Sequence, residues 1–553
     1  MAPSAAYLIE MARLRGAHVI PKIEMVLDDI TVDITAYYIS GGEFDQEKER
    51  DVDEISSGDI TFIFSNHNEY FSEYNASSLF YGKTYHNRKI KYSLGIRLPS
   101  GVIEYYSQFS ATIQDIEIQQ ESNQVSIYCR DCIYKIISER LNIYPTGLIP
   151  TAGGSNAGNG EVSSIACKPF ATIPETITIT FSSASAFSVS GSVSGALGSG
   201  TVGNLFTATG NKIRFLITAG TSAFVSGDTF TLTVTKLPEF TTTNVVKIIW
   251  ALLTGYDYDT DTILAFSAAC LGLDHTKSTA NTDLNYTDFV TAIANSPDIT
   301  LTGYVGYNSG AKETIQGLLA LCLGAIFADG DGNIDINIYR PSLGTTPREF
   351  SDALQITKFY YRRDIENMIN SCSGNYRKTN TFEWTDETPD LNGSYSTSDS
   401  ASITKYKTKK SFSLDTEWYS TTNPLIYLFT RILDRESNAP LEIELGTGLD
   451  GLITKVGDVA TITETKSGLS KKYVEVMQVK RSLGQDYKEI NLRALDSPYN
   501  MNWAFLGSSV DEGDGMGWEV AGSQNYDTAN TAQKQFAYLS TTGSVVAPLY
   551  YIW

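Results

Sequence analysis

In IKYSLGIRLPSGVIEYYSQF (residues 90–109), two runs rich in β-branched and aromatic residues flank a Pro-Ser-Gly turn. Such runs favour strands, and proline and glycine favour the turn between them. Runs of the same kind lie at Ile60–Phe64 (ITFIF) and Val125–Cys129. Asp131–Leu141 then has apolar residues at helical spacing, after an aspartate that can cap a helix. Residues 1–148 therefore predict a β-barrel-like domain closed by a helix.

The composition predicts a globular protein of several domains that is mainly β with α+β. The chain has 553 residues, of which 42% are hydrophobic and 19% charged, so enough apolar surface exists to offset the entropy lost on folding. At roughly 100 to 200 residues per domain, this length implies several packing units. The 33 tyrosines suit half-buried strand positions and subunit contacts.

Residues 149–240 predict a linker followed by an inserted small β-sandwich. Residues 149–160 are mostly small and polar, which predicts an exposed connection. From Ile173 to Lys236, Ser, Thr and Gly alternate with apolar residues, as strands require. GSVSGALGSGTVG (residues 191–203) could be a phosphate-binding loop, but it lacks the G-x-x-x-x-G-K-[ST] spacing and the following helix. A hairpin segment is the better interpretation.

Residues 241–350 predict an α+β domain. Val245–Leu253 (VVKIIWALL) and Lys312–Phe327 (KETIQGLLALCLGAIF) have helical periodicity, and Ile334–Tyr339 has that of a strand. One face of the second helix is expected to contain Ile315, Leu318, Leu319, Cys322 and Ile326. We therefore expect a helix that packs against a hairpin.

Residues 351–497 predict a second β-barrel-like domain, and residues 498–553 a C-terminal extension. A helix is expected at Pro424–Asn438. Strands are expected at Phe359–Tyr361, Ile369–Tyr376, Leu441–Leu445, Val459–Ile462, Tyr473–Val479 and Glu489–Ala494. The extension is aromatic and glycine-rich without a clear period, and it ends in the apolar SVVAPLYYIW. That apolar end predicts docking on another subunit or on the body of the chain itself.

The stretch ADGDGNIDINIY (residues 328–339) resembles the start of a calcium-binding loop. Oxygen-bearing side chains stand at alternate positions: Asp329, Asp331, Asn333 and Asp335. The sixth position of such a loop would be Ile334 instead of glycine, and the twelfth Arg340 instead of glutamate. A Gly-Asp-Gly-Asn hairpin turn is therefore the better interpretation.

The other candidates for chemistry favour structural roles. Cys129 and Cys132 have the spacing of zinc and redox sites, but no second pair completes a set of ligands, so packed thiols are expected. Acidic runs at Asp45–Glu54 and Asp257–Asp261 are typical of solvated faces, although carboxylates of a glycosidase pair only in space. The histidines occur singly, without a metal or triad motif, at His18, His67, His86 and His275. We therefore predict no catalytic residue, cofactor or metal ligand, and a protein that is not an enzyme.

The charge balance limits the classes of partner that the chain is expected to bind. The chain has 42 Lys and Arg against 63 Asp and Glu, and a net charge of −21 disfavours sequence-specific nucleic-acid binding, which needs clustered cations. Glu10, Arg13 and Arg15 interrupt the apolar stretch that a secretory signal needs, and the longest apolar run, Leu318–Ala328, is too short to span a bilayer. We expect a product made in the cytoplasm without a membrane-spanning segment.

Several motifs of the N-terminal domain resemble phage tail hub proteins of the siphophage and gene-transfer-agent type. Ile60–Phe71 stands where that family has an A-T-F-T-L-x-N-x-x-G-x-F strand and turn, and Tyr106–Ile113 where it has a P-L-F-x-G-x-I strand. The match is incomplete, because Glu69 replaces a common glycine and Ser110-Ala111 replace the usual T-G or x-G.

The resemblance continues in the same order along the chain. ETIQGLLALCLGAIFADGDGNIDINIYRP (residues 313–341) is similar to the helix-then-hairpin element of the family, and IENMINSCSGNYR (residues 365–377) to its V-V-N-x-V-x-V-x-Y strand. Leu452–Leu495 looks like the closing barrel, with a V-G-D turn at Val456–Val459. The resemblance covers most of the chain outside residues 149–240.

The resemblance implies a homotrimeric ring in which two barrel-like domains per subunit form a pseudo-hexameric surface. It implies a structural virion protein, the central hub of the tail tip or baseplate, made in the host cytoplasm. Its partners are then the distal tail protein or tail tube ring, tail-tip or fibre proteins and the tape measure protein. Closed barrels leave rigid faces without free sheet edges, which suits repeated contacts. The acidic balance suggests a channel wall that repels DNA during its transient passage.

Two other classes of function compete with this prediction. A receptor- or glycan-binding tail adhesin would use surface aromatics that stack on sugars, and the Ser/Thr/Gly-rich insertion is similar to accessory modules of virion proteins. A cell-wall hydrolase would need a lysozyme-like helical block, an H-E-x-x-H motif or a Cys-His signature, and none stands out in the sequence.

Overall fold

The structure, a computed structural model, describes the chain from residue 3 to residue 496 with short gaps. The described residues are 3–13, 19–28, 30–42, 44–47, 55, 57–119, 121–141, 149–210, 212–275, 283–296, 299–306, 309–338, 347–353, 355–448, 451–483 and 488–496. The predicted C-terminal extension, residues 498–553, lies outside the described residues, as do His18 and most of the run Asp45–Glu54.

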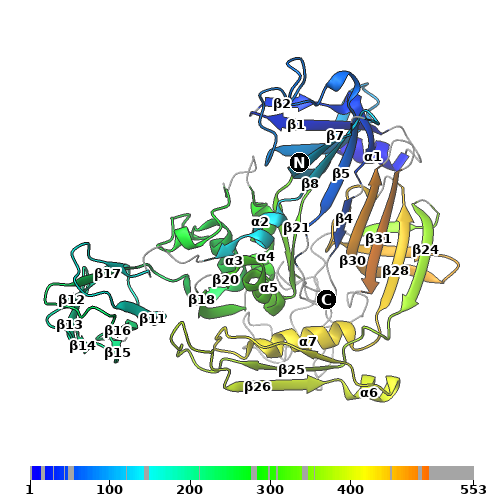
Figure 1. Ribbon diagram of the computed structural model, residues 1–553. Coiled ribbons are helices and arrows are strands. Elements are labelled where there is room, and N and C mark those ends of the chain that lie inside the picture. Colours follow the sequence, from blue (N-terminus) through cyan, green and yellow to red (C-terminus); the bar gives the residue numbers. More distant parts are fainter. Residues whose placement is uncertain are drawn as a thin grey trace.

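The first large unit is a curved seven-stranded antiparallel sheet, drawn at the top of Figure 1. Its strands, in spatial order, are β2 (Ile30–Asp33), β1 (Ile20–Leu27), β6 (Lys89–Arg97), β7 (Ile103–Gln119), β8 (Gln124–Arg130), β5 (Asp59–Ser65) and β3 (Tyr38–Gly41). Buried and less buried residues alternate along β5, so one face of the sheet turns to the core. Helix α1 (Ala5–Arg13) packs against β6.

The second large unit is also a seven-stranded sheet, antiparallel except for one parallel pair at its edge, and it lies below and beside the first one in Figure 1. Its strands, in spatial order, are β23 (Arg348–Ser351), β29 (Val459–Glu464), β30 (Leu469–Leu483), β31 (Lys488–Asp496), β28 (Leu441–Thr447) and β24 (Ile356–Arg363). A seventh strand, β4 (Phe44–Glu47), comes from the N-terminal part of the chain and pairs with β30. Buried residues of the two sheets form one continuous hydrophobic cluster, so the sheets share a core.

The α+β unit has its own hydrophobic core and lies below the first sheet and beside the second in Figure 1. Its helices are α2 (Ile133–Ser138), α3 (Val245–Thr254), α4 (Tyr286–Asn295), α5 (Ala311–Cys322), α6 (Ser400–Tyr406) and α7 (Pro424–Glu436). Its strand pairs are β18 (Glu239–Asn244) with β19 (Thr300–Tyr304), β9 (Arg140–Leu141) with β20 (Ser309–Gly310), and β21 (Gly324–Ala328) with β22 (Ile334–Ile338). A three-stranded sheet of β25 (Ser371–Tyr376), β26 (Gly393–Ser398) and β27 (Ser411–Ser413) packs against α7. Short 3-10 turns occupy Thr35–Tyr37, His67–Glu69 and Ser267–Ala269.

Two predicted helices extend too far. The helix expected to reach Phe327 ends at Cys322, because Leu323 adopts a left-handed conformation with φ of 52°, and Ile326 lies in strand β21. The helix expected to reach Leu141 ends at Ser138, and Leu141 lies in β9. An uninterrupted apolar run suits a buried helix and a buried strand equally well, so its period does not show where one becomes the other.

Other local predictions are confirmed. The mainly β fold with an α+β unit is present, and α7 begins at Pro424 after Asn423, whose side chain accepts a hydrogen bond of 3.0 Å from the Leu425 amide. Asp131 caps α2, because its Oδ1 accepts from the Ile133 amide at 3.0 Å. The glycine-rich residues 191–203 form a hairpin between β13 and β14 instead of a phosphate-binding loop.

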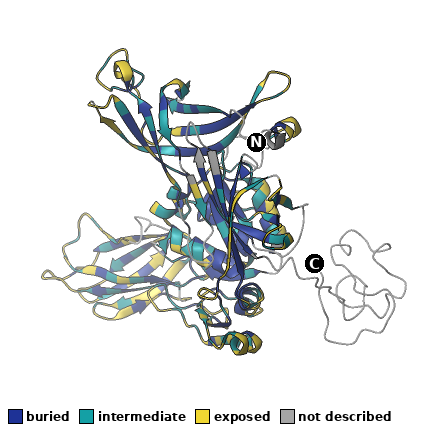
Figure 2. Cartoon of the chain, turned by 90° about the vertical axis from the view of Figure 1, so that its right-hand side faces the viewer, coloured by how far each residue is buried: buried dark blue, intermediate teal, exposed yellow. Residues whose placement is uncertain are grey.

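Residues 151–234 form a β-sandwich that projects from the body, at the left of Figure 1. One sheet contains β10 (Thr151–Ala152), β17 (Thr229–Val234), β12 (Glu175–Phe181), β13 (Ala186–Gly191) and β14 (Gly195–Thr201). The other contains β11 (Glu161–Cys167), β16 (Ile213–Thr218) and β15 (Leu205–Thr207). Phenylalanines and aliphatic residues of both sheets fill a core separate from those of the body. Figure 2 shows buried strands and exposed connections in the part of the chain that the structure describes.

The sandwich is docked on the loop at residues 377–393 between β25 and β26. The Arg214 guanidinium lies 4.8 Å from the ring centre of Trp384 and bonds Asp386 at 2.5 Å and Glu387 at 2.9 Å. The buried Arg377, which is 1% exposed, forms an ion pair with Glu383 of the same loop. The docking surface is therefore built from a cation, an indole ring and two carboxylates.

We expect Arg214→Ala to loosen this docking without unfolding the sandwich. The change removes the ion pairs and the indole contact, worth about 1 kcal/mol together at a partly exposed site. Hydrogen exchange of residues 382–387 should become several-fold faster, while exchange in β12 and β16 stays unchanged because their core is separate. Arg97→Ala, at an exposed arginine of the first sheet, serves as the control. Equal exchange at residues 382–387 in Arg214→Ala and wild type would contradict the assignment.

Candidate functional site at the junction of the two sheets

The turn between β21 and β22 forms the centre of this junction. Asp329 Oδ1 accepts hydrogen bonds of 2.8 Å from the amides of both Asp331 and Asn333, which closes the turn. The predicted Gly-Asp-Gly-Asn hairpin turn is therefore confirmed. Among the described residues, no group of three or more His, Cys, Asp or Glu side chains could hold a metal ion. The carboxylate that suggested a calcium loop in the sequence organises the backbone of a turn.

The tip of this turn is inserted against β7 of the first sheet. The Ser107 hydroxyl donates to the Gly330 carbonyl oxygen, and Lys91 Nζ lies 2.8 Å from Asp331 Oδ1. A Cβ atom at Gly330 would lie 2.4 Å from the Ser107 carbonyl oxygen, so only glycine allows this approach. The hairpin is thus fixed to the first sheet by backbone contact and by an ion pair.

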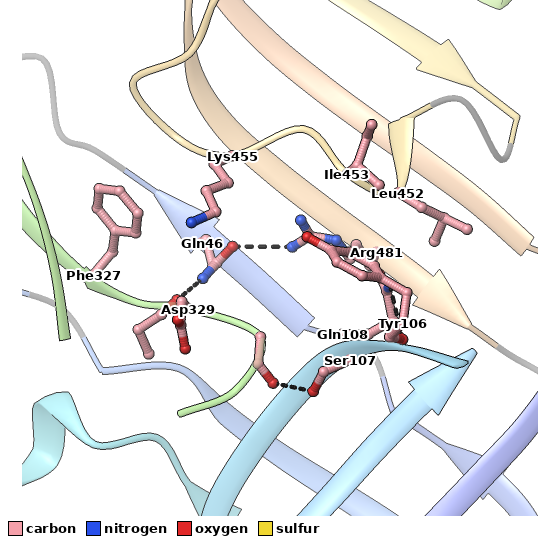
Figure 3. Close-up of a pocket in the computed structure, with 12 residues that line it drawn as sticks. Gln46, Tyr106, Ser107, Gln108, Phe327, Asp329, Leu452, Ile453, Lys455 and Arg481 are labelled. Carbon is pink, nitrogen blue, oxygen red and sulfur yellow. Dashed lines mark hydrogen bonds between the residues drawn. The ribbon is translucent and has the colours of Figure 1, made fainter. Parts of the chain in front are cut away.

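The second sheet contacts the same hairpin through β4 and β30. The Gln46 side chain donates to the Ala328 carbonyl oxygen and accepts from Arg481 Nη1 at 3.0 Å (Figure 3). Arg481 is 5% exposed, and its Nη2 donates to the Thr454 carbonyl oxygen at 2.8 Å. A strand from the N-terminal part of the chain therefore links the hairpin to the core of the second sheet.

The loop before β29 completes the junction. Lys455 Nζ lies 2.8 Å from Asp335 Oδ2, and Asn285 Nδ2 donates to Asp335 Oδ1 at 2.8 Å. Gly457, with φ of 85°, belongs to the V-G-D turn noted in the sequence, and a Cβ there would lie 2.6 Å from the Asn337 side chain. The V-G-D turn thus packs against β22.

Burial perturbs the ionisation of this cluster. Desolvation raises the pKa of Asp335 to about 7, partly opposed by Lys455, and raises the pKa of Asp329 to about 6, helped by the nearby Asp335 carboxylate. Burial lowers the pKa of Arg481 to about 10. For Asp331, burial works to raise the pKa, but the bond to Lys91 helps to hold the pKa below its usual value. The junction therefore has carboxylates that gain protons near neutral pH.

The contacts at the junction suit mechanical coupling of the two sheets. The cavity enclosed by Gln46, Ser107, Asp329 and Arg481 has a volume of about 20 Å³, which is room for about one water molecule. The contacts around it join two sheets, a hairpin and a connector strand. The cluster thus works as a lock that sets the position of one sheet relative to the other.

The remaining sequence candidates do not come together at this junction. Cys129 ends the alternating pattern of β8 and Cys132 precedes α2; both are buried, and burial raises the pKa of each thiol. His67 and His86 are exposed on separate loops, and His275 Nε2 lies 3.3 Å from Asp261. Asp257 and Asp259 lie in a surface turn, where Lys247 Nζ bonds Asp259 at 2.7 Å.

Sequence reasoning missed Gln46, Lys455 and Arg481. Their partners are 282, 120 and 27 residues away along the chain, so no local spacing marks them. The sequence predicted the acidic hairpin turn and showed the V-G-D turn. It did not predict that these turns contact other parts of the chain. A charged side chain at a buried position of an alternating strand, as Arg481 is near the end of β30 after Met477 and Val479, was the one available signal.

The fold and the junction define a β-rich protein with two curled seven-stranded sheets, an α+β unit and a projecting sandwich. No family model and no curated protein matches the chain. No helix in the described part of the chain is long and apolar enough to cross a membrane.

Solved structures with a similar arrangement are phage tail proteins and secretion proteins. A tail protein from Neisseria meningitidis is 8% identical, with a TM-score of 0.41 over 86% of this chain and 97% of that one. The prophage tail protein gp18 from Listeria monocytogenes is 7% identical, with a TM-score of 0.39 over 85% and 94%. A type VI secretion component from E. coli, described as similar to two T4 bacteriophage tail proteins, is 7% identical, with a TM-score of 0.32 over 90% and 83%.

Proposed function

We propose that this chain is a structural protein of a phage tail, and within the tail the hub of the tip or baseplate. The order of its sequence motifs supports the proposal, because the strand and turn, the helix and hairpin, and the V-G-D barrel all recur in the order of tail hub proteins. The presence of two seven-stranded sheets also supports the proposal, because the resemblance implies two barrel-like domains per subunit.

The locked junction is the observation that carries the proposal. A hub has to hold two ring-forming surfaces of each subunit at a constant angle, because a ring closes only when every subunit repeats the same geometry. Here the hairpin turn contacts β7 on one side, and β4 and Lys455 on the other. The shared hydrophobic core adds to this rigidity.

The proposed assembly is a homotrimer, in which three copies of two similar sheets give a surface of pseudo-six-fold symmetry. Its proposed partners are the distal tail protein or tail tube ring above, the tail-tip or fibre proteins below and the tape measure protein. The projecting sandwich is available for contacts outside such a ring. The net charge of −21 supports a channel from which DNA is repelled.

We also propose that the chain is not an enzyme. In the junction, each of the buried polar groups that sequence reasoning singled out is engaged in a structural contact: Asp329 with its turn, Asp331 with Lys91 and Asp335 with Lys455. Such contacts are expected of ion-pair networks that position domains.

The purified chain is expected to form a three-fold ring. Light scattering should give three times the chain mass of 60.7 kDa, and negative-stain images should show three-fold symmetry at the tail end of intact particles. A variant of the exposed loop tyrosine, Tyr74→Ala, should assemble as the wild type does. A monomer that is absent from purified particles would overturn the proposal.

A further inference from the structure

Four lysines form an exposed basic surface at the end of α6. Lys405, Lys407, Lys409 and Lys410 stand within six residues, in a chain with 42 basic against 63 acidic residues. The first three are exposed and Lys410 is half-buried. In the part of the chain that the structure describes, no carboxylate forms an ion pair with any of these four ammonium groups. We call residues 405–410 the lysine knob.

One of these lysines is kept in an unfavourable backbone conformation. Lys407 follows the last residue of α6 with φ of 54° and ψ of 29°. A glycine at this position would avoid the strain that a side chain meets in the left-handed region. Lys405, in contrast, is held to the body, with its Nζ 3.4 Å from Asn438 Oδ1 and 4.8 Å from the ring centre of Tyr406. Lys407 and Lys409 are therefore the ammonium groups best placed to reach another molecule.

An acidic groove of about 380 Å³ lies elsewhere on the same chain, beside β20 and the start of α5. Its lining includes the exposed carboxylates of Glu313, Asp415 and Glu417 together with Tyr304 and Trp418. No Lys or Arg stands among the described residues that line this groove. Within the same described ranges, none of the three carboxylates forms an ion pair. A cation that enters the groove would therefore meet both carboxylates and aromatic rings.

The lysine knob and the acidic groove lie at opposite ends of α7. Where α7 ends, the Ser402 hydroxyl of α6 donates to the Ser437 carbonyl oxygen. Where α7 begins, a Cβ at Gly374 would meet both Leu414 of the groove and Leu425 in the first turn of the helix. α7 has 13 residues and is therefore about 20 Å long. Figure 1 shows α6 beyond one end of α7, and β20 with α5 towards the other end.

This separation selects the partner of the two surfaces. A lysine side chain is much shorter than α7, so the knob and the groove of one copy do not reach each other. Nucleic acid or an anionic lipid would explain the lysines but not the groove, and a basic peptide would explain the groove but not the lysines. A second copy of the chain explains both, because every copy carries the two complementary surfaces. Surfaces at opposite ends of an element give a head-to-tail contact, which generates a ring when the rotation between copies closes.

We propose that the lysine knob of one copy docks in the acidic groove of a second copy, with Lys407 and Lys409 facing its carboxylates. This contact identifies the interface between neighbouring copies and therefore rests on the proposed homotrimer. Because each copy has a net charge of −21, the knob supplies cations at a place where two acidic molecules approach each other. The complementary charges also determine which surfaces meet.

Charge reversal in the knob tests this interface in solution. Light scattering over a range of concentrations measures the dissociation constant between copies. In the double variant Lys407→Glu, Lys409→Glu, this constant should rise about ten-fold or more, because like charges then face each other in the groove. The double variant Lys466→Glu, Lys471→Glu makes the same change of charge at exposed positions before and in β30, and should assemble as the wild type does. An unchanged constant in the knob variant would overturn the proposal and leave the proposed trimer intact.

A charge swap separates loss of contact from loss of structure. Glu313→Lys and Glu417→Lys are added to the knob variant, so an acidic knob faces a basic groove and the net charge returns to −21. Association should recover to within about three-fold of the wild type, because the charges are again complementary. An unchanged far-ultraviolet circular dichroism spectrum shows that the variants are folded. A folded swap variant that associates as weakly as the knob variant would show that the two surfaces do not meet, which overturns the proposal.

Crosslinking of the wild-type chain provides a test that depends on no variant. A carbodiimide joins lysine side chains to carboxylates in direct contact, and chains with light and heavy nitrogen, mixed at low concentration before assembly, show which links join two copies. The expected links run from Lys407 or Lys409 of one copy to the groove carboxylates of another. Links from the knob to other carboxylates alone, or no link from the knob, would overturn the proposal. A wild-type chain that stays a monomer and is absent from particles would contradict the proposed hub as well as this interface.

Discussion

Gly330→Val is expected to lower the apparent free energy of unfolding by about 3 kcal/mol, because the new side chain cannot fit against the backbone of β7. A Cβ at this position would lie 2.4 Å from the Ser107 carbonyl oxygen and 3.0 Å from its carbonyl carbon, and both atoms are held in the sheet. The hairpin has to move away, so the hydroxyl bond from Ser107 to Gly330 is lost with it. Chemical denaturation measures the loss in stability.

The location of the effect distinguishes this explanation from general destabilisation. Hydrogen exchange should rise in residues 103–113 and 324–338, which face each other across the junction, and stay unchanged in the projecting sandwich. Gly154→Val is the matched control, since nothing lies within 4 Å of a Cβ at Gly154. If Gly330→Val leaves both the stability and the exchange of these strands unaltered, the turn does not lock the sheets.

Lys455→Met is expected to cost much more stability at pH 8 than at pH 5. At pH 8 the Asp335 carboxylate is largely charged and 0% exposed, so removal of its cation costs about 3 kcal/mol, while the methionine keeps the apolar stem in place. At pH 5 the carboxylate is largely protonated, because its pKa is about 7, and the cost falls to about 1 kcal/mol. Denaturation at the two pH values measures the difference.

The direction in which stability changes with pH follows from proton linkage. The pKa values of Asp335 and Asp329 are raised in the folded chain, so the folded state binds protons more tightly than the unfolded state does. The stabilisation from this protonation is fully present below the usual carboxylate pKa. It is lost as the pH rises through about 6 to 7.

Lys91→Met is the matched control with a different pH dependence. The pKa of Asp331 is lowered, so Asp331 stays charged at both pH 5 and pH 8, and its ion pair is lost only as the pH falls through that lowered pKa. The pair is partly exposed and contributes about 1 kcal/mol at most. Equal losses for Lys455→Met at pH 5 and pH 8 would show that Asp335 does not titrate in this range.

The two variants separate the mechanical and electrostatic parts of the junction. Gly330 tests the close approach of backbones, which does not depend on pH. Lys455 tests the compensation of a buried carboxylate, which does. The proposed role as a tail hub would require the first property for ring closure, and the second makes the folded chain more stable in mildly acidic than in alkaline solution.

Much of the local structure was predictable from the sequence. Alternating apolar and polar residues, as in β5, predict a strand. The start of α7 is predicted by Asn423 and Pro424, and its course by a stripe of apolar residues. The turn at Asp329 was also recognisable, because short polar side chains and glycine favour that backbone conformation over any alternative. These features depend on residues close together in the chain.

The junction could not be predicted, because its contacts join distant parts of the chain. The acidic run that contains most of β4 predicted a solvated face, and nothing in it selects β30, more than 400 residues later, as the partner. Likewise, the sequence indicates only that Asp335 belongs to the region of a turn. Its ion pair with Lys455 exists only in the folded chain. The interpretation of Asp45–Glu54 as a solvated acidic face is changed for Gln46 and Glu47, which lie beside β30.

The sequence by itself thus determined many of the strands, helices and turns, since period, caps and glycine positions act locally, but not where α2 and α5 end. Tertiary structure alone decided which strands are neighbours, that the two sheets share a core, and that β24 remains at an edge. The physical reason is that alternation fixes the buried face of a strand but not its partner. The partner is chosen by the packing and charge compensation of the whole fold.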